Sequence, residues 1–220
     1  MIGHIQRDIL KGEKHPAEST KFIIDTFKGK STLFANFGNT QIALGLDFWL
    51  PYLPQIDLFQ LNLEEAKRFF ADKKKNATLV DVVDKIRSLD MTAVITLDKF
   101  GAIGIHRNKK DSIVLAWPLI GGEDIIDSTG AGDAFGAGLV SSVCHATVLD
   151  FSTFHNAIEV ARAWSALACQ SIGGSNDCPD RATIDHYIRQ IAGGENCPVE
   201  IKDQNYAAEI MSLIDIAFSE

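Results

Sequence analysis

Long apolar runs and paired cysteines are both missing from this sequence of 220 residues. No apolar stretch reaches the roughly 18 residues that a membrane-spanning helix needs, and the first residues, MIGHIQRDILKGEKHP, lack the apolar core of a signal peptide. The four cysteines form no C-x-x-C pair, which argues against a zinc site or a disulfide framework. These absences predict a cytoplasmic protein in a reducing compartment, with no membrane as its partner.

Positive charge is also scarce. Lys and Arg number 21 against 29 Asp and Glu, and the formal net charge is −8. A broad nucleic-acid surface needs clustered Lys and Arg, so we expect no nucleic-acid partner. The remaining composition, with 46% hydrophobic and 23% charged residues, is that of an ordinary globular chain.

Strand-like and helix-like segments alternate through the first hundred residues. Short apolar runs predict strands, and apolar residues at helical spacing predict helices between them. The predicted strands are 31–37, 56–61 and 92–97, and the predicted helices are 16–28, 41–53, one starting at 63, and 78–89. This alternation predicts an α/β fold, a Rossmann-like and mostly parallel sheet flanked by helices. Ligands of such sheets bind at the carboxyl ends of the strands, where Asn62, Thr96 and the loop before Gly130 fall.

The second half is predicted to be mainly helical. Two more strand-like runs, GAIGIHR and SIVLAW, precede a loop at 118–126. Everything beyond that loop is predicted to be helical, in the segments 130–146, 153–170, 181–192 and 205–218.

The segment IIDSTGAGDAFGAGLVSSV (125–143) places glycines and a carboxylate at the start of an apolar helix. A helix that starts Gly-Ala-Gly-Asp leaves backbone N–H groups facing outward, and its dipole attracts an anion. Asp133 would then stand beside an anion site, as suits a base that takes a proton from a hydroxyl next to a phosphate. The alternative, a capped helix with glycines that serve packing, is equally compatible with the spacing.

Asn62 and Glu65 are three residues apart at the start of another predicted helix. An amide and a carboxylate with waters between them could hold Mg²⁺ on a nucleotide phosphate. The same spacing is typical of a capping box, and the sequence alone favours that reading.

Several segments, taken together and in order, resemble one family. DSTGAGDAFGAG is similar to the C-terminal signature of the ribokinase-like (PfkB-type) carbohydrate kinases, and LFQLNLEEA to their strand followed by N-x-x-E. ITLDKFGA resembles their nucleotide turn, and ACQSIGGSNDCP the loop after their long C-terminal helix. The resemblance covers about residues 30–192 and implies a ribokinase-like fold.

The resemblance also implies an activity, which is transfer of the ATP γ-phosphoryl group to a hydroxyl of a sugar or similar small molecule. Asp133 would be the base, and the N–H groups of Gly130, Ala131 and Gly132 would form the anion hole. The remaining roles would be Mg²⁺ and its water shell at Asn62 and Glu65, the nucleotide at Thr96 and Gly101, and a monovalent cation such as K⁺ at Asp127 and the loop with Gly173 and Gly174.

The chain departs from the family pattern at particular positions. Asp98 stands where the nucleotide turn usually has glycine, which places a negative side chain near phosphates. Arg162 replaces a small or amide residue near the base of the nucleotide, and Ser128 replaces threonine.

The substrate-binding half and the β-sheet lid of the family are not recognisable. We therefore expect 1–192 to be the C-terminal nucleotide-binding part of such a kinase, incomplete at the N-terminus, and 193–220 to be a helical extension. Two consequences are expected: weak or absent activity of the chain alone, and homodimerisation through an uncovered sheet edge. A non-catalytic nucleotide- or phosphate-binding protein derived from such a kinase remains the alternative.

Overall fold

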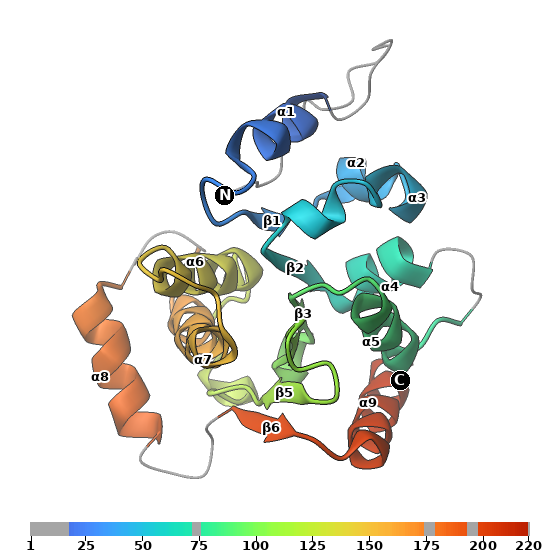
Figure 1. The fold of residues 1–220 in the computed structure, drawn as a ribbon. Coiled ribbons are helices and arrows are strands. Elements are labelled where there is room, and N and C mark those ends of the chain that lie inside the picture. Colours follow the sequence, from blue (N-terminus) through green and yellow to red (C-terminus); the bar gives the residue numbers. More distant parts are fainter. Residues whose placement is uncertain (1–17, 72–75, 174–178, 193–197, 220) are drawn as a thin grey trace. The chain divides into compact units, whose positions relative to one another are not determined.

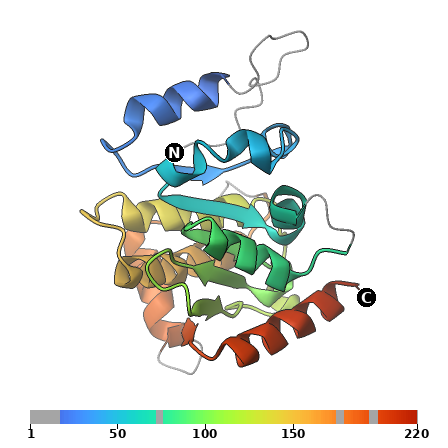
Figure 2. The ribbon, with the colours of Figure 1, turned by 45° about the vertical axis from the view of Figure 1, so that its right-hand side comes forward.

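The computed structural model describes residues 18–71, 76–173, 179–192 and 198–219. They form a six-stranded sheet, in the order β1-β2-β3-β4-β5-β6, with flanking helices (Figures 1 and 2). The predicted α/β class is confirmed. The sheet is mixed, since β1 and β2 are parallel whereas β4, β5 and β6 are antiparallel neighbours.

The chain divides into two compact units. Unit 1 comprises 1–95, 105–111 and 203–220, and unit 2 comprises 96–104 and 112–202. The elements of unit 1 are α1 (Glu18–Phe27), β1 (Phe34–Asn36), α2 (Asn39–Ile42), α3 (Leu46–Trp49), the 3₁₀ helix η1 (Leu53–Gln55), β2 (Leu58–Asn62), α4 (Leu63–Ala71), α5 (Leu79–Ser88), β3 (Ala93–Thr96, ending at the boundary) and α9 (Gln204–Ser219). Those of unit 2 are η2 (Asp98–Phe100), β4 (Ala102–Ile105), β5 (Ile113–Ala116), η3 (Gly122–Asp124), α6 (Ala131–Val143), α7 (Phe151–Ala168), α8 (Arg181–Ala192) and β6 (Val199–Ile201).

An aromatic cluster forms part of the core of unit 1. The Phe37 ring lies 4.5 Å from that of Trp49 and 4.8 Å from that of Phe59, centroid to centroid. All three side chains are almost fully buried. Tilted and edge-to-face contacts of this kind stabilise a core beyond the area that the rings bury. The apolar runs that predicted the first two strands therefore reflect burial of this cluster against the sheet.

The C-terminal helix α9 lies beside α5 in unit 1 (Figures 1 and 2). Its Asp215 accepts a hydrogen bond from the backbone N–H of Leu79, the first residue of α5, at 2.6 Å. The other carboxylate oxygen of Asp215 lies 2.6 Å from the Lys67 ammonium of α4. A carboxylate at a helix N-terminus satisfies an unpaired donor and opposes the helix dipole. Asp215 thus joins three helices of unit 1.

Glycine allows close packing between α6 and α7 in unit 2. A Cβ atom at Gly138 would lie 2.5 Å from the Cα atom of Ala161, closer than real Cβ contacts come. Only a residue without a side chain permits this approach of two helix backbones. Packing therefore accounts for Gly138, the glycine that is least expected in the middle of a helix.

Two sequence-based expectations are wrong. The predicted helix at 41–53 is broken into α2, α3 and η1, because Gly45 between the first two adopts a left-handed φ of 77°. The region beyond 130 is not helical throughout, since β6 pairs antiparallel with β5, with Ile201 opposite Ile113. The predicted helical extension at 193–220 therefore contains a strand as well as α9; residues 193–197 lie outside the described part.

No helix in the described part of the chain has the length and apolar character that crossing a membrane requires.

Candidate active site

The residues predicted to form an anion site lie at the start of α6. Gly130 precedes the helix in the left-handed conformation, with φ 80° and ψ 0°. The N–H of Ala134 is bonded to the carbonyl oxygen of Gly130 at 2.8 Å, and this bond closes the first turn. The N–H of Ala131 donates to Ser128 within the preceding turn, at 3.1 Å. Of the three predicted donors, Ala131 is therefore partly committed before any anion binds.

Gly132 and Asp133 differ from the packing glycine of the same helix. A Cβ atom at Gly132 would meet no atom within 4 Å, whereas one at Gly138 would collide with α7. Both Gly132 and Asp133 are exposed. The two readings of this segment thus apply to different glycines: packing explains Gly138, whereas a Cβ atom at Gly132 would lie in open space.

Asp127 connects two loops of unit 2. One carboxylate oxygen accepts the backbone N–H of Thr129 at 2.9 Å, and the other accepts that of Gly173 at 3.0 Å. The hydrogen bonds from Thr129, followed by that from Gly173, hold the pKa of Asp127 below its usual range. The carboxylate is therefore anionic and fixes the loop before α6 to the loop after α7. Gly174, predicted beside it, lies outside the described residues.

The turn between β3 and β4, which the sequence predicts to contact the nucleotide, is tightly closed. Leu97 donates to the carbonyl oxygen of Gly101 at 2.7 Å, and Phe100 donates to that of Leu97 at 2.9 Å. Gly101 has a φ of 89°, and a Cβ atom there would lie 2.0 Å from the carbonyl oxygen of Ala116. Glycine is therefore required at this position. Thr96, the other predicted residue of the turn, is the last residue of β3.

Asn62 and Glu65 form a reciprocal capping box. The N–H of Glu65 donates to the Asn62 side-chain oxygen at 2.8 Å, and the N–H of Asn62 donates to a Glu65 carboxylate oxygen at 3.0 Å. The reading that the sequence favoured is thus present in the structure. The box still leaves one Glu65 oxygen for a cation.

The donor set limits how a cation could be held. The described residues contain no group of three or more His, Cys, Asp or Glu side chains able to hold a metal ion. Mg²⁺ often uses one or two carboxylates and keeps several waters, so Glu65 with Asn62 fits such a water-rich site.

Sequence reasoning missed the partner of Arg162. The buried Arg162 guanidinium, 4% exposed, forms two hydrogen bonds with Glu159, at 2.7 and 2.9 Å. It also donates to the carbonyl oxygen of Trp117 at 3.1 Å. The three-residue spacing of Glu159 and Arg162 on one helix was the available signal. Arg162 is therefore committed inside unit 2.

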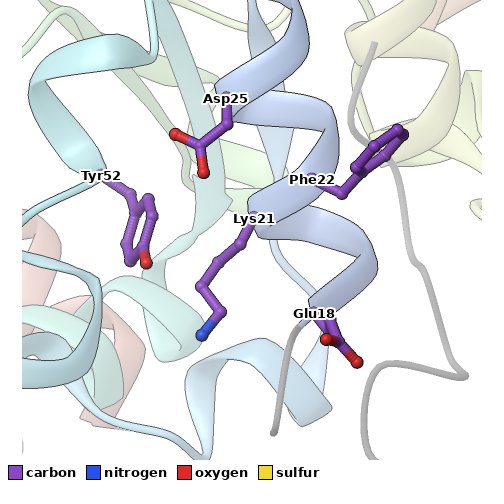
Figure 3. Close-up of a pocket in the computed structure, with 5 residues that line it drawn as sticks. All are labelled: Glu18, Lys21, Phe22, Asp25 and Tyr52. Carbon is purple, nitrogen blue, oxygen red and sulfur yellow. The ribbon is translucent and has the colours of Figure 1, made fainter.

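A pocket of about 350 Å³ lies in unit 1 (Figure 3). None of the residues that line it is a predicted site residue. Its lining residues are Glu18, Lys21, Phe22, Asp25 and Tyr52. Lys21 and Asp25 extend on the side of α1 that faces Tyr52, whereas Phe22 points away. The Lys21 ammonium lies 5.9 Å from the centre of the Tyr52 ring, a cation–π contact.

Solved structures share this fold. A fructokinase from Vibrio cholerae O395, in a form bound to fructose, ADP and calcium ion, matches with a TM-score of 0.63 and 20% identity, over 78% of this chain and 55% of its own. An aminoimidazole riboside kinase from Salmonella enterica, complexed with aminoimidazole riboside and an ATP analog, matches with a TM-score of 0.55 and 23% identity, over 69% and 48%. The chain thus spans about half the length of these kinases.

Sequence comparison identifies the family. An uncharacterized sugar kinase from Dictyostelium discoideum is 36% identical over 67 residues, which are 30% of this chain and 18% of that protein. Residues 46–181 match the pfkB family carbohydrate kinases, and this range includes Asn62, the nucleotide turn and the start of α6. The chain therefore belongs to the pfkB family of carbohydrate kinases.

Proposed function

We propose that the chain performs ATP-dependent phosphoryl transfer to a hydroxyl of a sugar or similar small molecule, with Asp133 as the base. The observation that carries the proposal is the open space at Gly132 beside the exposed Asp133, at the N-terminus of a 13-residue helix. Backbone N–H groups and the helix dipole favour an anion there, and the absence of a side chain lets phosphate oxygens approach.

In the proposed reaction the acceptor oxygen attacks the γ-phosphorus of ATP, the bond to the β-phosphate oxygen breaks, and ADP leaves. The proton of the acceptor hydroxyl passes to the carboxylate of Asp133. The N–H groups of Gly130, Ala131 and Gly132 stabilise charge on the transferring group. Thr96 and Gly101 line the phosphate and ribose side of the nucleotide.

The proposed cations have separate places. Asn62 and Glu65 would hold Mg²⁺ and its waters, and Mg²⁺ neutralises phosphate charge during transfer. Asp127 and the loop at Gly173 would take K⁺, because the anionic Asp127 keeps free lone pairs after accepting its two N–H bonds.

Substitution of Gly132 by leucine tests the anion site. The side chain would fill the open space, so we expect at least a tenfold loss of Mg-ATP affinity by calorimetry and an unchanged melting temperature, because no clash arises inside the chain. Gly121→Leu is the matched control, since a Cβ atom at Gly121 also meets nothing within 4 Å. Equal affinities of the Gly132 variant and the unaltered chain would refute the proposed anion site.

A second function remains open as a proposal: a non-catalytic nucleotide- or phosphate-binding protein derived from such a kinase. The observation that favours it is Asp98 in the nucleotide turn, which is exposed and negatively charged. Since the chain spans about half the length of the solved kinases, we also propose that it turns over slowly by itself. The effect of Asp133→Asn on phosphoryl transfer separates the two functions.

We further propose that the chain forms a homodimer through β1, which stands at one end of the strand order. The free edge of a terminal strand is a template for pairing with another chain. Light scattering over a range of concentrations should then give a mass that rises toward that of a dimer. A monomer mass at every concentration would refute this pairing.

A further inference from the structure

Asp98 occupies a backbone conformation that normally selects glycine. Its φ is 51°, in the left-handed region, where only glycine, asparagine and aspartate are common. Its carbonyl oxygen accepts the N–H of Gly101 at 3.2 Å, within the closed turn between β3 and β4. Gly101 lies so close to the backbone at 116–118 that a Cβ atom would collide with it, and Asp98 is exposed on this closed turn.

The same turn lies close to the loop before α6. Burial, and then the negative charges of Asp127 and Asp98, raise the pKa of the Cys169 thiol. The carbonyl oxygen of Cys169 accepts the N–H groups of Ile126 and Asp127, at 2.8 and 3.2 Å. The charges of Asp98 and Asp127 thus both act on Cys169, whose carbonyl oxygen is bonded to the loop before α6. Gly101 of the same turn lies against residues 116–118, where that loop starts.

The neighbouring basic side chains are engaged elsewhere. The Lys99 ammonium lies over the Phe100 ring, 5.2 Å from its centre. Arg162 is buried in its pair with Glu159. Neither cation forms an ion pair with the carboxylate of Asp98, so a polyphosphate bound at this turn would meet that negative charge.

We propose that Asp98 is a specificity-determining residue that makes nucleotide binding depend on a bound divalent cation. The inference rests on the proposed function, since it takes the turn at 96–101 as the phosphate side of the nucleotide pocket. A free nucleotide carries its full polyphosphate charge toward Asp98 and is repelled. A divalent cation on the phosphates cancels part of that charge, so the metal complex is repelled less.

Asp98→Asn provides the test, because asparagine keeps the size of the side chain and tolerates the left-handed conformation. We expect about a tenfold gain in affinity for ADP or ATP in EDTA, as one nearby charge is removed. The gain for the Mg²⁺ complexes should be threefold or less, and salt should diminish both gains. Calorimetry with each nucleotide, in EDTA and in Mg²⁺, measures the four affinities.

Asp90→Asn is the matched control. Asp90 is also a left-handed turn residue, with φ 58°, and belongs to unit 1, where its carboxylate lies 2.8 Å from the Lys110 ammonium. This variant makes the same chemical change and should alter none of the four affinities.

The outcomes separate the two claims. Suppose that the unaltered chain binds nucleotide. If Asp98→Asn then changes the affinities for metal-free and Mg²⁺-bound nucleotide by the same factor, or changes neither affinity, the role of Asp98 is refuted and the proposed function stands. If the unaltered chain and the variant bind no nucleotide in any condition, the proposed function fails and the inference falls with it. A gain in affinity that is larger for metal-free nucleotide than for its Mg²⁺ complex supports both the proposed function and the role of Asp98.

Discussion

Asparagine in place of Asp133 is expected to lower phosphoryl transfer by about 10²–10⁴-fold, the usual contribution of a general base. The carboxylate is exposed at the start of α6, so its loss should disturb no packing. It would act only when the acceptor loses its proton, so the affinity for Mg-ATP should stay within about threefold of its original value. Transfer of the labelled γ-phosphoryl group to a panel of sugars and nucleosides, under single-turnover conditions, measures the effect.

Asp124→Asn is the control, since it removes another exposed carboxylate close in the chain. It should leave transfer unchanged. If the unaltered chain and Asp133→Asn bind nucleotide equally well and transfer phosphoryl at the same background rate, the non-catalytic alternative is correct and Asp133 is not a base.

Glutamine in place of Glu159 should destabilise the protein by about 3–5 kcal/mol, because it leaves the buried Arg162 guanidinium without a counter-charge. The shape of the side chain is conserved, so the loss would come from charge and not from a cavity. A fall in melting temperature of roughly 10 °C follows from the usual scaling for chains of this size. Urea and thermal unfolding, followed by circular dichroism, measure it.

Two further variants test whether the unpaired charge of Arg162 causes the destabilisation by Glu159→Gln. Asp185→Asn removes the carboxylate from the exposed Arg181–Asp185 pair, with a contact of 2.8 Å, and should cost less than about 1 kcal/mol. Replacing Glu159 and Arg162 together by apolar residues of similar volume should recover most of the loss. A destabilisation by Glu159→Gln no larger than that by Asp185→Asn would show that the buried pair is unimportant.

The sequence predicted most of the elements, and its errors have physical causes. Apolar periodicity located α5, α7 and α8, because these helices bury one side continuously. It failed at 41–53, where Gly45 breaks the helix although apolar residues continue on both sides. It also failed at β6, since a three-residue strand with only Ile201 buried gives no recognisable alternation.

The candidate site was predicted from local motifs, and its long-range contacts were not. Glycines and Asp133 at the start of α6 were evident from spacing, as was the capping box of Asn62 and Glu65. The hydrogen bond between Asp127 and Gly173 joins residues 46 apart, and no periodicity encodes such a pair. The spacing also could not distinguish a packing glycine from an open one, because that difference depends on which neighbouring helix lies nearby.

The division of the C-terminal tail has a consequence for biosynthesis. β6 belongs to unit 2 and α9 to unit 1, and Asp215 of α9 contacts both α4 and α5. Unit 1 therefore needs a helix that is synthesised after unit 2, although most of unit 1 is made first. Its early part must wait, with the N-terminus of α5 incompletely capped, until α9 emerges. The fold of unit 1 is thus completed only after all of unit 2 has been synthesised.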